Sequence, residues 1–209
     1  MLENINKGEF FHPRLRVCSN LSGLNPILSS IRADRSGGTP LRNNISAVGE
    51  IMGRKWQSEN DLGQDGMIIG IPRSGIPMGD GLRTVFSGYN YYLSNDGANK
   101  NTSQPVLPDD LSFDRVTNLL IADSVIVTGT TIAQTLRAAL SKIRSIDKIA
   151  VFSAFASAEG IMNLLDMFPE LEINIGSLAK IKQHWDIHRW KLSPTLEGIP
   201  NIGELVSRT

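Results

Sequence analysis

Small hydroxylated residues follow an apolar segment near the middle of the chain, and their pattern suits the binding of a phosphate group. Residues 119–122 read Leu-Leu-Ile-Ala, Asp123 ends this apolar run, and Thr128-Gly129-Thr130-Thr131 follows shortly after it. From Ile132 onward apolar residues recur at helical spacing, so a helix is expected to begin inside the threonine cluster. The first N–H groups of a helix have no partner within it. Together with threonine hydroxyls and a small glycine, they would bind a phosphate monoester.

The threonine run has a second interpretation as an ordinary strand–turn–helix junction, because every α/β protein needs such turns. It is not a Walker A loop, since no Gly-Lys-Ser/Thr ending is present, and it is not a dinucleotide-binding turn, since Gly-x-Gly-x-x-Gly is absent. The local residues alone leave the phosphate site and the plain junction open.

A second turn with phosphate-binding character follows another apolar run. Residues 67–71 read Met-Ile-Ile-Gly-Ile, and Pro72-Arg73-Ser74-Gly75 comes directly after them. Backbone N–H groups in such a turn, beside a guanidinium that can bind phosphate through two hydrogen bonds, suit a diphosphate. The alternative is a surface turn whose arginine is solvated.

The elements that must position these turns alternate between strand-like and helix-like patterns. Strands are expected over 67–71, 119–122, 148–154 and 172–177. Helices are expected over 27–56 in two pieces broken at 35–40, around Leu82 and Val85 after a lead-in at 76–81, from 132 through 143 and from 156 through 168. This alternation predicts an α/β fold with a mostly parallel sheet, helices on both faces, and a site at the carboxyl ends of the strands. Residues 1–26 are expected to form an arm or an irregular segment, and the polar run at 94–103 either a disordered excursion or a lid.

Length and charge restrict the classes of function. The 209 residues suit one domain, and 21 basic residues balance 21 acidic ones, so no global charge favours nucleic acid or an anionic membrane. The single cysteine, Cys18, fits a reducing cytoplasm, where we expect the protein. No apolar run has the length of a signal peptide core or a membrane helix.

Both turns resemble motifs of the type I phosphoribosyltransferases. Asp123-Ser-Val-Ile-Val-Thr-Gly-Thr-Thr131 resembles the loop that binds 5-phosphoribosyl-1-pyrophosphate (PRPP), and Arg73-Ser-Gly-Ile-Pro-Met-Gly-Asp-Gly81 resembles the Arg-Ala-Gly turn of the uracil phosphoribosyltransferases. The uracil branch also has a single acidic residue in its PRPP loop, as this chain does. Glu159-Gly160, after the third expected strand, resembles the Glu-Gly of an Ala-Pro-Glu-Gly run in the same branch. Tyr89-Asn90-Tyr91-Tyr92 stands where the branch carries an arginine on its flexible hairpin, and Lys100 is a candidate substitute.

The resemblance implies a type I phosphoribosyltransferase fold with a flexible hairpin or lid and an N-terminal helical arm. It implies that PRPP is bound by two sets of residues. Arg73, Ser74 and Gly75 would bind the diphosphate, and the ribose with its 5-phosphate would be bound by Asp123, Ser124, Val127, Thr128, Gly129, Thr130 and Thr131. Arg73 and Asp123 would be the catalytic residues. Mg²⁺ is expected to be held mainly through the diphosphate of PRPP, without a dedicated protein metal site. A homodimer or higher oligomer is expected. Arg32 would be a phosphate contact if it reached the site, and otherwise a surface residue.

The C-terminal segment departs from the family pattern. A Pro-Gly-Leu-Gly-Asp-Ala-Gly-Asp run holds the base in uracil phosphoribosyltransferases, and the corresponding run here is expected within 192–203. Its acceptor-binding residues would be Leu192, Glu197, Gly198 and Ile199, with Glu197 a candidate general base or orienting group. The nearby Trp185 and Trp190 could stack on an acceptor or belong to the core, and His184 with His188 could hold a metal or form a solvated face.

These observations predict a single phosphoribosyltransferase-like domain over 1–209, with an N-terminal arm and helices over 1–56, an α/β core over 67–178 and an acceptor-binding segment over 179–209. The expected enzyme transfers the 5-phosphoribosyl group from PRPP to uracil or to a different aromatic or heteroaromatic acceptor, and releases diphosphate. The alternative is a non-catalytic PRPP- or nucleotide-binding regulator on the same fold. No nucleic acid or membrane partner is expected.

Overall fold

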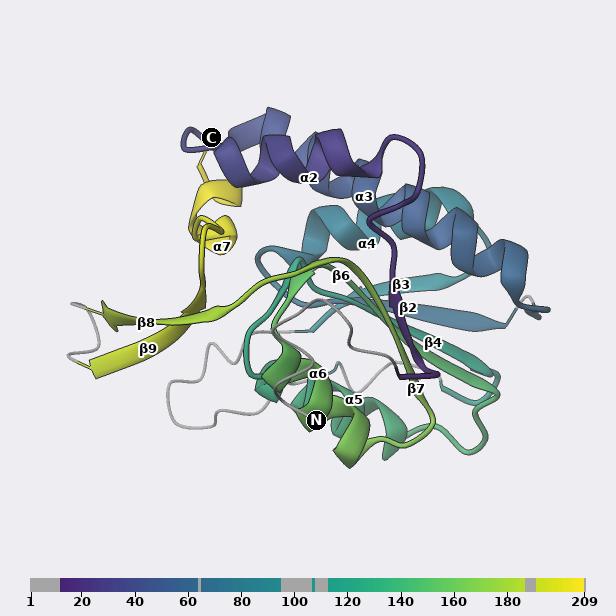
Figure 1. The fold of residues 1–209 in the computed structure, drawn as a ribbon. Helices are drawn as coiled ribbons and strands as arrows, with labels where there is room; N and C mark the ends of the chain where they lie inside the picture. The colour runs from purple at the N-terminus through teal and green to yellow at the C-terminus, as the bar shows by residue number, and fades with distance from the viewer. Residues whose placement is uncertain (1–11, 64, 95–106, 108–112, 187–190, 209) are drawn as a thin grey trace.

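The computed structural model describes residues 12–63, 65–94, 107, 113–186 and 191–208. Strands and helices alternate along most of the chain (Figure 1). The strands are β1 Leu15–Val17, β2 Gly66–Gly70, β3 Asn90–Leu93, β4 Asn118–Ala122, β5 Val125–Ile126, β6 Lys148–Ala156, β7 Leu171–Leu178, β8 Ile181–Asp186 and β9 Lys191–Leu196. The helices are α2 Leu24–Ala33, α3 Gly38–Glu59, α4 Gly75–Val85, α5 Thr130–Leu140, α6 Ala158–Met167 and α7 Ile202–Val206.

One seven-stranded sheet forms the centre of the protein, with the order β1-β7-β6-β4-β2-β3 and the short β5 paired to β6. Every pairing in this sheet is parallel. A parallel sheet needs crossover connections, and helices supply those from β2 to β3, from β4 to β6 and from β6 to β7. The predicted α/β class with a mostly parallel sheet is therefore confirmed.

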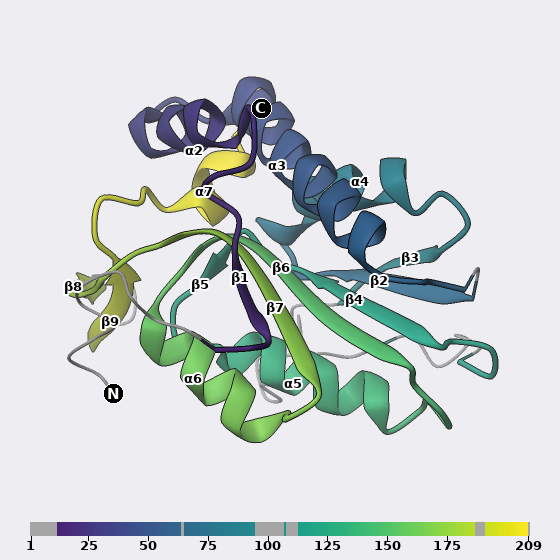
Figure 2. The same cartoon turned by 45° about the vertical axis from the view of Figure 1, so that its right-hand side comes forward.

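Helices cover both faces of the sheet, with α2, α3 and α4 on one side and α5 and α6 on the other (Figure 2). The central strand β4 is buried throughout and contributes to two apolar clusters in alternation. Leu120 and Ala122 pack with α2, α3 and α4, whereas Leu119 and Ile121 pack with α5 and α6. Side chains of a strand point alternately to its two faces, so a continuous apolar run is what a strand covered on both sides requires.

Helices α3 and α4 cross so closely that two glycines are needed at the contact. A Cβ atom on Gly81 would lie 1.9 Å from the carbonyl oxygen of Ser46, and one on Gly49 would lie 2.4 Å from that of Met78. Because α4 begins directly after the turn at residues 72–75, this contact also fixes where that turn lies.

The N-terminal region and the edge of the sheet at residues 90–93 are more regular than the sequence indicates. Within the region expected to be irregular, Leu15–Val17 form an edge strand parallel to β7, and α2 already begins at Leu24. Asn90–Leu93, expected in the hairpin zone, form the opposite edge strand. The two expected helical pieces over 27–56 are present as α2 and α3, and a non-helical connection at residues 34–37 separates them.

The chain after β7 leaves the main sheet. Strands β8 and β9 pair as a separate antiparallel hairpin, and α7 returns to lie beside α2 and α3 (Figure 1). Arg42 of α3 fixes this helix, because its Nε donates a hydrogen bond to the carbonyl oxygen of Val206 at 2.8 Å. Among the described residues, none of the helices is both long enough and apolar enough to span a membrane.

Candidate active site

The first phosphate-type turn and the start of the stretch that leads into the second meet at the carboxyl ends of neighbouring strands. The first turn follows β2, and Asp123 and Ser124 follow β4, which pairs directly with β2; the Thr128–Thr131 turn comes after the short β5, which pairs with β6. The hydroxyl of Ser74 donates a hydrogen bond to Oδ1 of Asp123 at 2.9 Å, and the hydroxyl of Ser124 donates to the carbonyl oxygen of Ser74. Residues that are about 50 positions apart in the sequence are thus joined at one edge of the sheet.

The first turn packs tightly against the end of β4. A Cβ atom on Gly75 would lie 2.1 Å from the carbonyl oxygen of Ala122, so no other residue fits there without displacing the backbone. The peptide bond between Pro72 and Arg73 is cis. Arg73 itself is exposed, and its guanidinium lies close to α7, 3.9 Å from the position that a Cβ on Gly203 would take.

The second turn has the geometry expected for an anion site at a helix N-terminus. Gly129 adopts a left-handed conformation with φ of 76° and precedes the first turn of α5, where Thr130 and Thr131 are exposed. The hydroxyls of Thr128 and Thr130 are 3.0 Å apart. Hydroxyl and backbone donors therefore face solvent at the positive end of the helix dipole.

Helix α6 supports this turn from below. The hydroxyl of Ser157 donates to the carbonyl oxygen of Val127, and the side-chain amide of Asn163 donates to that of Thr128 at 3.2 Å. A Cβ on Gly160 would lie 2.6 Å from the Val127 carbonyl oxygen. The Glu159-Gly160 stretch, singled out in the sequence, contributes its glycine to close packing under the loop, while Glu159 is exposed.

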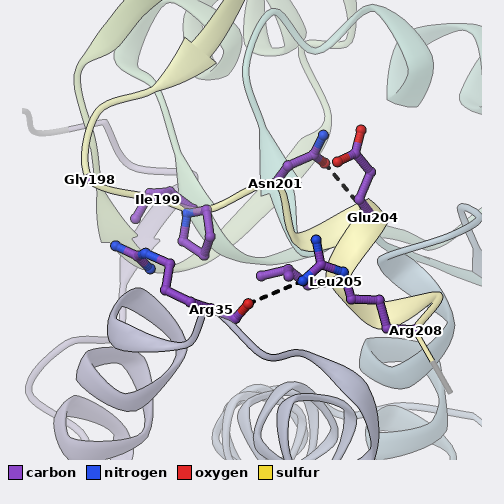
Figure 3. A pocket seen from close by; sticks show the side chains of 8 residues that line it. Arg35, Gly198, Ile199, Asn201, Glu204, Leu205 and Arg208 are labelled. Carbon is purple, nitrogen blue, oxygen red and sulfur yellow. Dashed lines mark hydrogen bonds between the residues drawn. The ribbon is translucent and has the colours of Figure 1, made fainter.

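Three of the residues expected to bind the acceptor lie at the base of the β8–β9 hairpin and beyond it, whereas Leu192 lies near its tip. Glu197 is exposed, and its N–H donates to the carbonyl oxygen of Lys180 at 2.7 Å, which closes the hairpin. Gly198 and Ile199 line a cavity of about 360 Å³ (Figure 3). Leu192 belongs to β9, and its side chain lies outside the described part of the structure.

The cavity beside Gly198 and Ile199 also contains residues that the sequence did not single out. Arg35 enters from the α2–α3 connection, and Glu204 and Arg208 enter from α7 and the residue stretch after it (Figure 3). A signal for Glu204 was present: Pro200-Asn-Ile-Gly-Glu-Leu-Val-Ser207 fits the Pro-Gly-Leu-Gly-Asp-Ala-Gly-Asp motif in a later register, with its proline, second glycine and first acid matched. No comparable pattern pointed to Arg35.

Arg32 reaches the carboxyl end of β7 and is half-buried there. Its Nη2 donates to the hydroxyl of Ser177 at 2.7 Å, and its guanidinium carbon lies 5.1 Å from the centre of the Phe155 ring. A guanidinium above an aromatic ring gains a cation–π attraction. Arg32 is therefore anchored at the sheet edge and is not a freely solvated helix residue.

A second cavity, of about 400 Å³, lies between α3, α4 and α7, and Arg73 lines it together with Arg42 and Asp80. Burial disfavours the charged form of the Asp80 carboxyl and raises its pKa, while nearby Arg83 acts in the opposite direction. The Arg73 guanidinium thus borders a polar space beside the first turn.

Several expected features fall outside the described residues. Lys100 and nearly all of the expected lid at 94–103 belong to this group, as do His188 and Trp190. His184 and Trp185 lie on the strand β8, and their side chains are not described; His184 is thus not on the helix that a pairing with His188 would require. Among the described residues there is no cluster of three or more His, Cys, Asp or Glu side chains that could hold a metal ion.

A parallel sheet with helices on both faces and two phosphate-type turns at its carboxyl edge defines the type I phosphoribosyltransferase class. The chain belongs to the uracil phosphoribosyltransferase family, whose family model matches residues 41–184. A search of curated proteins found no match.

Solved structures share the fold at low sequence identity. The AQ2163 protein from Aquifex aeolicus is 18% identical with a TM-score of 0.71, over 92% of this chain and 97% of that one. The adenine phosphoribosyltransferase from Leishmania tarentolae is 11% identical with a TM-score of 0.56, over 81% of this chain and 93% of that one. That from Leishmania donovani is 9% identical with a TM-score of 0.55, over 81% and 85%.

Proposed function

We propose that the protein transfers the 5-phosphoribosyl group of PRPP to a ring nitrogen of a heteroaromatic acceptor and releases diphosphate. The observation that carries this proposal is the hydrogen bond of 2.9 Å between Ser74 and Asp123, which joins the first turn to the start of the stretch 123–131 that contains the second turn. PRPP carries a phosphate and a diphosphate on opposite sides of a ribose. Two adjacent anion sites with a carboxylate between them match that arrangement.

Each turn has its own part of PRPP in this proposal. Val127 and the Thr128–Thr131 run hold the 5-phosphate through backbone N–H groups and hydroxyls. Asp123 accepts hydrogen bonds from the ribose hydroxyls, with Ser124 keeping the two turns together. Arg73, Ser74 and Gly75 hold the diphosphate, and the exposed guanidinium of Arg73 provides the positive charge.

Magnesium fits this donor set as an ion held mainly by its substrate. Mg²⁺ keeps several waters and binds through one or two carboxylates together with phosphate oxygens. Asp123 is the carboxylate placed between the two turns. The ion would supply charge neutralisation at the diphosphate, while the residues of the chain orient PRPP.

The proposed reaction needs no nucleophilic side chain. The lone pair of an acceptor nitrogen forms a bond to C1 of the ribose, the bond from C1 to the diphosphate oxygen breaks, and diphosphate leaves with the electron pair. Where the attacking nitrogen carries a proton, that proton passes to a carboxylate at the acceptor site or to water; a pyridine-type nitrogen has none to lose and leaves the product as a cation. Because positive charge develops on the sugar, catalysis rests on positioning and on stabilising the leaving group, in which Arg73 and Asp123 take part.

The acceptor would bind on the C-terminal side, at Gly198 and Ile199, with Leu192 and Glu197 as further candidates from the sequence. Glu204 joins them, because it lines the same cavity and Glu197 is not among the residues that line it. The carboxylate of either residue could accept an acceptor N–H. The candidate acceptors are uracil and a different heteroaromatic compound.

The test is the release of diphosphate from PRPP and Mg²⁺ by the purified protein, with uracil and then with a panel of other bases and heteroaromatic acids. Turnover with uracil would identify the usual family acceptor, and turnover only with another compound would identify a changed specificity. Binding of PRPP without turnover on any acceptor would favour a non-catalytic regulator. Absence of PRPP binding would contradict the proposal.

A further inference from the structure

We propose that the acceptor carries a carboxylate, which Arg35 and Arg208 bind in the cavity beside Gly198 and Ile199. This inference rests on the proposed function, because it takes that cavity as the acceptor site. Its volume of about 360 Å³ suits a molecule with one ring and small substituents. The side chains of Ile199 and Leu205 provide apolar wall against which such a ring can pack (Figure 3).

Both arginines are held in place by backbone carbonyl groups. Nη1 of Arg35 donates to the carbonyl oxygens of Arg32 at 2.7 Å and Asp34 at 2.8 Å. Nη1 of Arg208 donates to the carbonyl oxygen of Arg35 at 3.2 Å. These bonds restrict the side chains without neutralising their charge, and they leave the other N–H groups of each guanidinium available.

The cavity has an excess of positive charge. Within the described part of the chain, neither Arg35 nor Arg208 forms a salt bridge with a carboxylate. Glu204 is the acidic residue of the lining, and Figure 3 shows its carboxylate on the opposite side of the cavity from the Arg35 guanidinium.

The other nearby carboxylate, Asp34, is engaged by the turn between α2 and α3. Its Oδ1 accepts hydrogen bonds from the N–H groups of Ser36 and Gly37, both at 2.8 Å. These bonds, with a smaller effect of Arg35, lower the pKa of Asp34, so it is ionised at neutral pH. Asp34 therefore stabilises the turn that carries Arg35. Because the Asp34 carboxylate is bound by these N–H groups, the Arg35 guanidinium stays available for a ligand.

The position of the two arginines makes the charge a feature of the acceptor and not of PRPP. Both line the cavity together with the residues predicted to bind the acceptor, whereas the proposed PRPP contacts at Thr128–Thr131 and Ser74 are not among its lining. A planar guanidinium binds a carboxylate through paired hydrogen bonds, which an uncharged base such as uracil cannot provide. The ring would bear its carboxylate on the side away from the attacking nitrogen.

The experiment compares matched pairs of acceptors that differ only in this group. Pyridine and pyrimidine carboxylates, and their carboxamides, are offered with PRPP and Mg²⁺, and diphosphate release and calorimetric binding are measured. The proposal expects turnover with a carboxylate and a KM at least about 10-fold higher for its carboxamide, as the loss of a charge-assisted hydrogen bond predicts.

Variants locate the effect. Arg35→Ala and Arg208→Ala are each expected to raise the KM for the carboxylate by about 10-fold and to leave PRPP binding unchanged. Arg144→Ala is the matched control, because Arg144 is exposed and follows α5 on the other face of the sheet. Arg35→Lys and Arg208→Lys should keep part of the affinity that the alanine variants lose, since lysine keeps the charge and loses the paired geometry.

The outcomes separate this inference from the proposed function. Turnover that does not favour any carboxylate over its carboxamide, or variants that behave like Arg144→Ala, would overturn the inference and leave the transferase proposal standing. A carboxylate that binds without being turned over would overturn its role as acceptor, whereas the transferase proposal fails only if PRPP is turned over with none of the compounds, uracil included.

Discussion

The two halves of the proposed site are built differently. The PRPP half consists of two turns that leave buried strands and pack backbone against backbone, as at Gly75, where a Cβ would lie 2.1 Å from a neighbouring carbonyl oxygen. The acceptor half consists of exposed side chains from the α2–α3 connection and from the C-terminal residues, joined by contacts such as that of Arg208 with the carbonyl oxygen of Arg35, 173 positions apart.

This difference determines which residues of the site tolerate substitution and which do not. A tightly packed turn leaves no room for another residue, because overpacking strains the backbone. Side chains on the rim of an open cavity can be exchanged at little cost in stability. This construction allows the acceptor side to change while the tightly packed turns stay. In this chain the C-terminal segment departs from the uracil pattern, as does Tyr89-Asn90-Tyr91-Tyr92, where that branch carries an arginine.

The largest effect is expected when a methyl group is added to the PRPP half. Gly75→Ala should lower the free energy of unfolding by about 3 kcal/mol, the upper end for overpacking, and should abolish PRPP binding because the two turns separate. Thermal unfolding and calorimetry measure these effects. Gly63→Ala is the control, since the nearest atom to a Cβ there is 3.9 Å away. Equal behaviour of the two variants would show that the turn is not held as described.

A smaller effect is expected from removing a charge between the turns. Asp123→Asn keeps the shape of the side chain but weakens its hydrogen bonds to Ser74 and to the ribose, so PRPP should bind about 10- to 100-fold more weakly. Calorimetric titration with PRPP and Mg²⁺ measures the change. Asp147→Asn, at an exposed position before β6, should bind PRPP as the wild type does. Unchanged affinity in Asp123→Asn would remove this residue from the site.

The acceptor half offers a comparison of two carboxylates. Glu204→Gln should reduce turnover by about 10-fold with the acceptor once it is known, because Glu204 lines the cavity. Glu197→Gln should change turnover by less than about 2-fold, because Glu197 is exposed and outside the lining. A larger loss of turnover in Glu197→Gln than in Glu204→Gln would assign the orienting role to Glu197, as the sequence predicted.

The last prediction concerns the anchoring of α7 and is measured as stability instead of binding or turnover. Arg42→Met removes the hydrogen bond to the Val206 carbonyl oxygen and should cost about 1.5 kcal/mol of stability, the value for a charge-assisted bond. Arg54→Met on the same helix removes an exposed pair with Glu50 and should cost about 0.5 kcal/mol or less. Thermal unfolding distinguishes the two. Similar losses would mean that α7 is held by its apolar contacts alone.

The sequence predicted the core of the fold because local patterns carry that information. Continuous apolar runs such as 119–122 identified strands covered on both faces, and the threonine run located the start of α5 at Thr130. The edge strands β1 and β3 were missed, since short and partly exposed strands have no continuous apolar run and are defined by their pairing with a neighbour.

The same reasoning explains what could be predicted of the site. The two turns follow their strands directly in the sequence, so their residue types and order were visible. The cavity at Ile199 depends on Arg35 and Arg208, which come together only when α7 packs on α3 through contacts such as that of Arg42 with Val206. No local spacing in the sequence records such a contact. The match of Pro200–Ser207 to the family run places Glu204 in the segment but does not show which residues of α2 and α3 it meets.

The central claim is that each turn holds its own phosphate group of PRPP, and phosphorus NMR tests it most directly. PRPP and Mg²⁺ bound to the wild type should show shifted signals for the 5-phosphate and for the diphosphate. Thr131→Val should alter the 5-phosphate signal alone, and Arg73→Lys the diphosphate signals alone. If neither set of signals shifts on addition of the protein, or if both variants alter the same group, the assignment of the two turns is contradicted.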